Sequence, residues 1–144
     1  MTKRNQTAAN RLLWTAQIVT GLLFLFAGSM KFILPADKMQ GPIALPIAFI
    51  HFIGIAEVAG ALGLILPGLF RIQTRLTPLA ALGLLVIMVG ATVLTAVGMG
   101  IAPALFPAVV GATVSYIAYG RSRVVPLRER APRRAEARPL ARAA

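Results

Sequence analysis

The sequence contains no cysteine, only four acidic residues and a single histidine, His51. Without cysteine the chain has no thiolate ligands for a metal or an iron–sulfur cluster, and no thiols for disulfide exchange. One histidine is too few to give a haem two histidine ligands. The glycine patterns that bind nucleotides, GxGxxG and the P-loop, are absent as well. We therefore expect no metal site and no intrinsic cofactor.

Apolar residues, by contrast, are abundant and make up 58% of the 144 residues, with a mean hydropathy of +0.78. A soluble domain needs a more polar surface and is about 45–50% apolar. The excess falls into runs of about 20 residues, the length of helix that crosses a hydrocarbon layer of about 30 Å. The sequence therefore predicts an all-α fold, an integral membrane bundle of four transmembrane helices, with spans at about 12–34, 47–66, 78–97 and 101–119.

The segments around these spans read as helix ends and connections. Residues 1–11 form a basic N-terminus, in which Asn10 is a candidate N-cap for the first span. Residues 35–46 contain three prolines and a glycine and predict a loop. Pro67-Gly68 is expected to close the second span, and Pro78 suits the first turn of the third. Residues 121–144 predict a basic, disordered tail.

The formal net charge of +11 is concentrated at the ends of the chain, since residues 1–12 carry +3 and residues 121–144 carry +6. This distribution argues against nucleic-acid binding and matches the basic flanks of membrane spans. Because Lys and Arg stay preferentially on the cytoplasmic side, we expect both termini to be cytoplasmic (N-in/C-in) in a bacterial-type inner membrane. Contact with anionic lipid headgroups or an acidic partner is expected for four arginines: Arg121, Arg123, Arg128 and Arg130.

Three ionisable side chains lie within the predicted spans, and they are the candidate site residues: Lys31, His51 and Glu57. A charge at the centre of a transmembrane helix costs about 2.5–3.5 kcal/mol on insertion scales, so such residues usually pair or mark a site. Lys31 and His51 lie near the outer ends of their spans, whereas Glu57 is about 15 Å deep. Glu57 is open to three states: a protonated carboxyl, an ion pair with Lys31, or a polar pocket with Thr92, Thr95 or Ser115. Two roles are open for Glu57: a structural one, in which it ties the first span to the second, and a chemical one, in which it takes part in proton or quinone chemistry.

Small residues recur at helical spacing in all four spans and indicate surfaces where helix backbones approach closely. In the second span Gly54, Glu57 and Ala61 share a face, and in the fourth Pro107 is expected to kink the helix. The residues assigned to helix packing are Gly21, Gly28, Gly54, Gly60, Gly63, Gly90, Pro107 and Gly111.

Two of these segments resemble the DoxX-like family of small four-span membrane proteins. The likeness rests on Gly21-Leu-Leu-Phe-Leu-Phe-Ala-Gly28-Ser-Met-Lys31-Phe32 and on Ile53-Gly54-Ile-Ala-Glu57-Val-Ala-Gly60-Ala-Leu-Gly63. Relatives include a subunit of a thiosulfate–quinone oxidoreductase, members of redox-stress complexes and animal proteins that assist receptor assembly. The resemblance implies that Lys31 and Glu57 are the recurrent intramembrane charged pair. Related sequences often carry a histidine late in the third span, where this chain has Thr92-Val-Leu-Thr95.

Three functions follow as hypotheses. The first is a non-catalytic accessory or assembly subunit of a larger, redox-linked membrane complex, with other membrane subunits or further copies of itself as partners. The second is a quinone-linked oxidoreductase subunit in which Glu57 or His51 handles a proton and quinone is the cofactor. The third is a small-molecule or proton carrier. Catalytic residues are not assigned beyond the three candidates.

Overall fold

The structure, a computed structural model, describes residues 3–39 and 43–127, and all regular secondary structure in these ranges is helical. Four segments are long and apolar enough to cross a membrane, which confirms the predicted fold class. The elements are α1 (Lys3–Ile33), α2 (Ala36–Met39), α3 (Ile47–Phe70), α4 (Leu76–Met99), α5 (Ile101–Tyr119) and a π-helical turn, η1 (Gly120–Val124), that extends α5.

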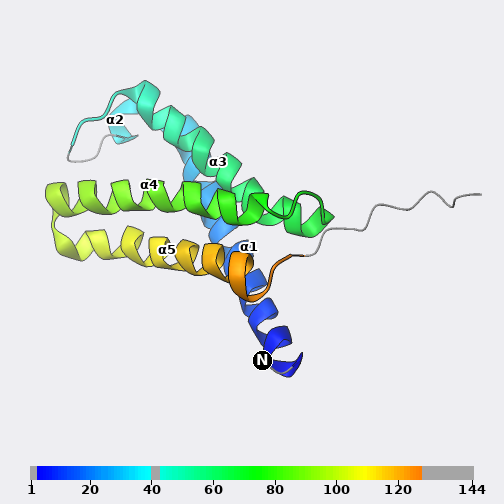
Figure 1. Ribbon diagram of the computed structural model, residues 1–144. Helices are drawn as coiled ribbons and strands as arrows, with labels where there is room; N and C mark the ends of the chain where they lie inside the picture. The colour runs from blue at the N-terminus through cyan, green and yellow to red at the C-terminus, as the bar shows by residue number, and fades with distance from the viewer. Residues whose placement is uncertain (1–2, 40–42, 128–144) are drawn as a thin grey trace, which may run out of the picture.

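The four long helices pack in chain order, with α1 mainly on α3, α3 on α4 and α4 on α5. Helices α4 and α5 run antiparallel and side by side, while α1 crosses the bundle obliquely (Figure 1). The connection between α4 and α5 is a single residue, Gly100, with φ at +95°. A side chain is disfavoured in this region of φ, so glycine permits the abrupt reversal.

Several helix ends differ from the prediction. Helix α1 already includes Asn10, so the proposed N-cap there is wrong, and a short helix, α2, lies in the predicted loop. Helix α3 continues through Pro67 to Phe70 and is capped by Arg71, which has a left-handed backbone with φ at 56°. The last turn of α3 packs tightly on α1, because a Cβ at Gly68 would lie 2.9 Å from the ring of Trp14. This packing outweighs the one hydrogen bond that proline removes. Of the predicted disordered tail, residues 121–144, the structure describes residues 121–127, the first four of which belong to η1. The rest of the tail lies outside the described residues.

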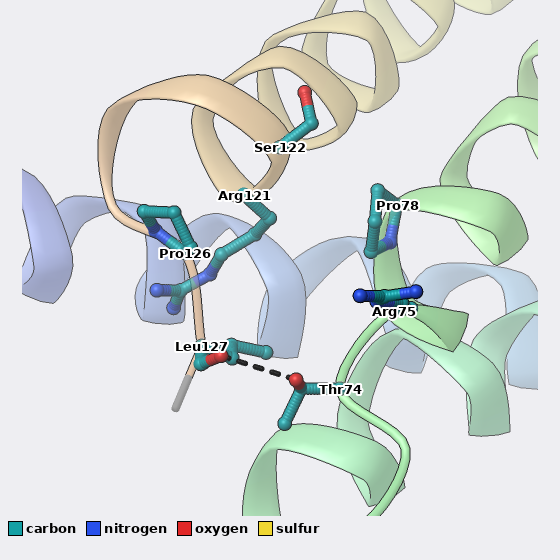
Figure 2. Close-up of a pocket in the computed structure, with 7 residues that line it drawn as sticks. All are labelled: Thr74, Arg75, Pro78, Arg121, Ser122, Pro126 and Leu127. Atoms are coloured by element: carbon teal, nitrogen blue, oxygen red, sulfur yellow. Dashed lines mark hydrogen bonds between the residues drawn. The ribbon is translucent and has the colours of Figure 1, made fainter. Parts of the chain in front are cut away.

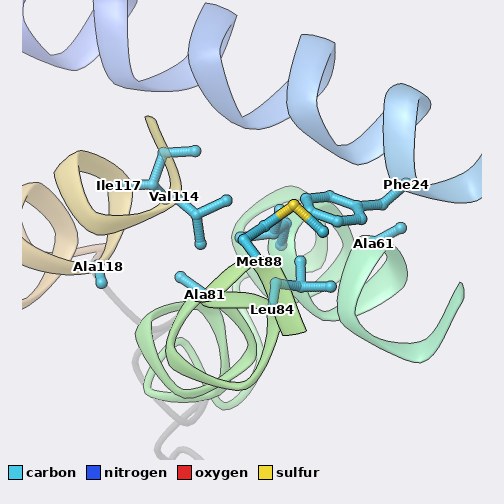
Figure 3. Packing of buried hydrophobic residues seen from close by; sticks show 9 residues of the cluster. Phe24, Ala61, Ala81, Leu84, Met88, Val114, Ile117 and Ala118 are labelled. Atoms are coloured by element: carbon cyan, nitrogen blue, oxygen red, sulfur yellow. The ribbon is translucent and has the colours of Figure 1, made fainter. Parts of the chain in front are cut away.

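The buried core lies between all four long helices and combines small and large apolar side chains (Figure 3). Its members are Phe24, Ala61, Leu64, Ala81, Leu84, Met88, Val114, Ile117 and Ala118. Many large apolar side chains elsewhere point outward; the side chain of Val86, for example, is 72% exposed. Apolar surface on the outside is expected when hydrocarbon, rather than water, is the solvent.

The glycines assigned to helix packing behave differently from one another. A Cβ at Gly28, Gly54, Gly60 or Gly63 would meet atoms of a neighbouring helix at 2.6–2.9 Å. Gly21 and Gly111 also lie against neighbouring helices, and Pro107 is buried within a continuous α5. Gly90 departs from the expectation, because it is exposed and a Cβ there would meet nothing within 4 Å.

Candidate functional site

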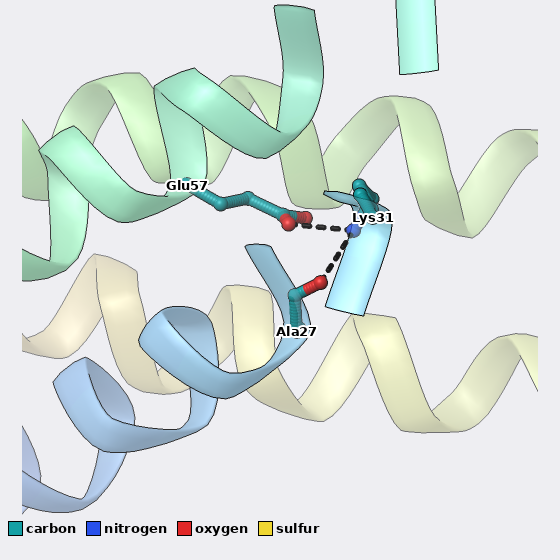
Figure 4. A network of polar contacts seen from close by, with 3 residues as sticks. All are labelled: Ala27, Lys31 and Glu57. Carbon is teal, nitrogen blue, oxygen red and sulfur yellow. Dashed lines mark hydrogen bonds and ion pairs between the residues drawn. The ribbon is translucent and has the colours of Figure 1, made fainter. Parts of the chain in front are cut away.

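Lys31 of α1 and Glu57 of α3 form an ion pair inside the bundle, the second of the three states open from the sequence. The Lys31 Nζ atom lies 2.5 Å from Glu57 Oε2 and also donates a hydrogen bond to the Ala27 carbonyl at 3.4 Å (Figure 4). The Glu57 side chain is 5% exposed and that of Lys31 is 26% exposed. The carboxylate is therefore sealed within the protein, whereas the ammonium lies at its edge.

Side-chain direction explains why the two residues meet although Glu57 lies deeper. Helical side chains lean toward the N-terminus of their own helix. Because α1 and α3 run in opposite directions, Lys31 leans from the C-terminal end of α1 toward the middle of the bundle, and Glu57 leans from the middle toward that same end. The two charged groups thus meet between the levels of their Cα atoms.

Two glycines bring the backbones of α1 and α3 close at this point. A Cβ at Gly28 would lie 2.9 Å from the Gly54 carbonyl oxygen and 3.2 Å from the Cβ of Glu57. A Cβ at Gly54 would lie 3.1 Å from the Gly28 carbonyl oxygen and 3.1 Å from the Cβ of Lys31. Each glycine therefore faces the charged residue of the other helix. Because the two backbones are close at this point, the side chains of Lys31 and Glu57 can reach each other.

Three other candidate polar residues, His51, Thr92 and Ser115, make contacts of their own. His51 is half-buried and stacks on Phe32 with ring centroids 5.2 Å apart. The hydroxyl of Thr92 donates to the Met88 carbonyl, and that of Ser115 to the Gly111 carbonyl, so both bond within their own helices. In the described residues Glu57 has Lys31, rather than a hydroxyl of α4 or α5, as its polar partner.

A second polar cluster lies at the opposite end of the bundle and is centred on Arg121, which is 3% exposed. Its Nε donates to Gln17 Oε1 at 2.5 Å, and its Nη1 donates to Asn10 Oδ1 at 2.7 Å and to the Val125 carbonyl at 3.3 Å. Gln17 in turn donates to the Leu64 carbonyl of α3. The guanidinium carbon lies 5.4 Å from the ring centroid of Trp14. This cluster joins α1 to the end of α5.

The sequence grouped Arg121 with surface contacts, but the structure buries it. Its partners were overlooked because amides carry no formal charge. A detectable signal was present, since Asn10, Trp14 and Gln17 recur at helical spacing on one face of α1. Arg123 is exposed, as a lipid-contacting residue would be, whereas Arg128 and Arg130 lie outside the described residues.

The two polar clusters consist of an ion pair with no net charge, Lys31–Glu57, and a hydrogen-bonded arginine, Arg121. The described residues contain no group of three or more His, Cys, Asp or Glu side chains placed to hold a metal ion. An ion pair costs less in a low-dielectric interior than either charge alone, so Lys31 and Glu57 each make the other tolerable in the membrane. The pair fixes the register of α1 against α3.

These features define a small multi-pass membrane protein whose four-helix bundle contains an intramembrane lysine–glutamate pair. The chain belongs to the DoxX-like family, whose model matches residues 15–117. The matched range begins within α1 and ends within α5, so it includes the ion pair and excludes Arg121. Comparison with curated proteins and with solved structures gives no match.

Proposed function

We propose that this chain is a non-catalytic accessory or assembly subunit of a larger membrane complex in a bacterial-type inner membrane, with both termini cytoplasmic. The observation that carries the proposal is an outward-facing seam on α4 with no partner in the described part of the chain. The redox character of the complex rests on the family resemblance.

The seam follows a spacing of four and three residues along α4. Its members are Leu79, Gly83, Val86, Gly90, Val93 and Val97. All six are exposed, and Val97 at the far end is 75% exposed. A Cβ at Gly83 or Gly90 would meet nothing within 4 Å. At these two positions the backbone of α4 is therefore open to the approach of another helix.

This pattern suits a neighbouring transmembrane helix. Alternation of four and three residues keeps one face of a helix toward a partner over several turns. Because apolar side chains gain little by leaving lipid, membrane helices associate through close backbone approach, which small residues permit. The glycines of α1 and α3 already serve the bundle itself, whereas Gly83 and Gly90 are left for an external helix.

The polar groups support an accessory role over autonomous chemistry. Lys31 and Glu57 are engaged with each other, and Arg121 is engaged with the Asn10 and Gln17 side chains. These contacts connect α1 to the other helices at both ends of the bundle. They tie α1 to α3 and to the end of α5, and α3 and α5 are the two helices on which α4 packs.

The experiment is to purify the tagged chain from its native membrane in mild detergent and identify bound proteins by native mass spectrometry. We expect a stoichiometric larger partner, which Gly90→Leu releases while the melting temperature of the chain itself is unchanged. Ala108→Leu is the matched control, since it adds the same side chain to an exposed position on α5.

Two results would contradict the proposal. One is recovery of the wild-type chain alone or only with copies of itself, which would favour a carrier or quinone-binding role. The other is retention of the partner by the Gly90→Leu variant, which would place the interface elsewhere.

A quinone-linked subunit is the second candidate, and the stacked rings of Phe32 and His51 favour it. Phe32 is adjacent to Lys31 in sequence and exposed to the surroundings, so a flat quinone headgroup could stack there beside the ammonium. In that case His51→Phe, which retains a stacking ring without its nitrogens, should lower the rate of quinone reduction by the purified complex without releasing the partner. An unchanged rate would exclude a role for His51.

A further inference from the structure

A pocket of about 650 Å³ opens beside Arg121, at the end of the bundle away from the ion pair. Figure 2 shows Arg75 and Pro78 at the start of α4 facing Pro126 and Leu127, which follow η1. Its remaining lining residues are Thr74, Arg121 and Ser122. One part of the pocket wall is therefore polar, with two arginines and the hydroxyl groups of a threonine and a serine. The other part is apolar and consists of two prolines and a leucine.

The two arginines have hydrogen-bonding capacity that the described residues leave unused. A guanidinium has five N–H donors. In Arg121 the Nε and Nη1 atoms are bonded, but Nη2 is buried and has no partner. Arg75, across the pocket, is exposed and no described carboxylate lies within ion-pair distance of it.

Acidic groups that could neutralise this region are scarce in the whole chain. Residues 3–39 and 43–127 contain two of its four acidic residues: Glu57 is paired with Lys31, and Asp37 belongs to α2 at the other end of the bundle. Glu129 and Glu136 lie outside the described residues. A buried arginine is usually compensated by a charged partner, because desolvation of an unpaired charge is costly. Among the described residues, Arg121 has two neutral amides and a carbonyl as its hydrogen-bond partners and no carboxylate within ion-pair distance.

We propose that this pocket binds a phosphate group, with Arg121 and Arg75 as its ligands from opposite walls. Planar guanidinium groups match phosphate oxygens in geometry and charge. The pocket lies where α5 leaves the predicted membrane region, and exposed Leu76 and Leu79 of α4 continue from it along the bundle. An anionic phospholipid fits both parts, its phosphate between the arginines and an acyl chain along α4. A free phosphate ion shares the first contact only.

Arg75 is the residue to change, because it lines the pocket without taking part in the hydrogen bonds that join α1 to α5. The full-length protein would be purified in detergent with phosphatidylglycerol or with phosphatidylcholine, and retained lipid counted by native mass spectrometry. In a second arm, inorganic phosphate would be added to lipid-free protein and its melting temperature compared with that in sodium chloride of equal ionic strength. Arg123→Gln is the control, since it removes the same charge from an exposed residue outside the pocket.

We expect one phosphatidylglycerol per chain, with retention reduced about tenfold by Arg75→Gln and unchanged by Arg123→Gln; losing one charge-assisted contact is worth about that factor. Stabilisation by inorganic phosphate that Arg75→Gln abolishes, without selective lipid retention, would establish the phosphate site and identify a free anion as its source. Equal losses in the two variants would show diffuse attraction and overturn the proposal. An absence of effect in both arms would overturn it as well.

Discussion

Glu57 lies against Gly28, whereas its carboxylate bonds to Lys31, three residues nearer the C-terminal end of α1. The side chains therefore bridge about one helical turn in depth, and the direction in which each leans is what makes the bridge short. If the two helices were parallel, both side chains would lean the same way, and the difference in depth between them would remain. The pair thus depends on the antiparallel arrangement of α1 and α3 as well as on charge.

Removing one charge of this pair should destabilise the bundle. We expect Glu57→Gln to lower the free energy of unfolding by about 1–3 kcal/mol, because Lys31 loses its counter-charge but can still reach the membrane edge. Thermal denaturation of the purified protein in detergent measures the effect. The double variant Lys31→Met with Glu57→Gln should recover most of the loss, because the stranded ammonium is gone.

Lys38→Met is the control for the pair, since Lys38 is exposed on α2. It should change stability by no more than about 0.5 kcal/mol. If Glu57→Gln proved as harmless as this control, the ion pair would not contribute to stability.

The contact between α1 and α3 should be sensitive to a single methyl group. In Gly28→Ala the new Cβ would lie 2.9 Å from a backbone oxygen of Gly54, so the helices must separate, at a cost of about 1–3 kcal/mol. Gly90→Ala is the matched control, because its methyl group meets nothing within 4 Å. Melting temperatures of the two purified variants decide the matter, and equal values would contradict the close packing at Gly28.

The arginine cluster should depend on the Gln17 amide. In Gln17→Leu the Nε of Arg121 loses its acceptor, and the Leu64 carbonyl loses a donor, so we expect a loss of about 2–3 kcal/mol. Thr15→Val is the comparison, since that exposed hydroxyl donates to a carbonyl of its own helix. Comparable denaturation of the two variants would show that the cluster adds nothing to the fold.

The predicted orientation can be tested with single cysteines, because the chain has none of its own. Lys38→Cys should react with a membrane-impermeant maleimide in intact cells. Arg71→Cys and Arg123→Cys should react only after permeabilisation, since the excess of basic residues keeps their side of the bundle inside. All three positions are exposed in the structure. The reverse labelling pattern would invert the topology.

The helices could be predicted from the sequence because hydropathy in runs of about 20 residues is dictated by the bilayer itself. The helix ends were harder to predict, since Pro67-Gly68 reads as a stop, whereas Gly68 packs closely on Trp14 of α1 in a helix that continues to Phe70. The Lys31–Glu57 pair could be named as one alternative, but its formation depends on side-chain direction and close backbone approach between two helices. Arg121 illustrates the opposite case, because a basic residue beside a tail reads as surface until Gln17 and Asn10 are placed beside it.

The Arg121 cluster also constrains the order in which the protein is made. Gln17 precedes Arg121 by 104 residues, so the ribosome has synthesised three further membrane helices before this partner exists. During that interval the amides of α1 lie in the membrane without their guanidinium. A nascent chain released before residue 121 would therefore leave the side-chain oxygens of Asn10 and Gln17 without the guanidinium donor that the finished chain supplies.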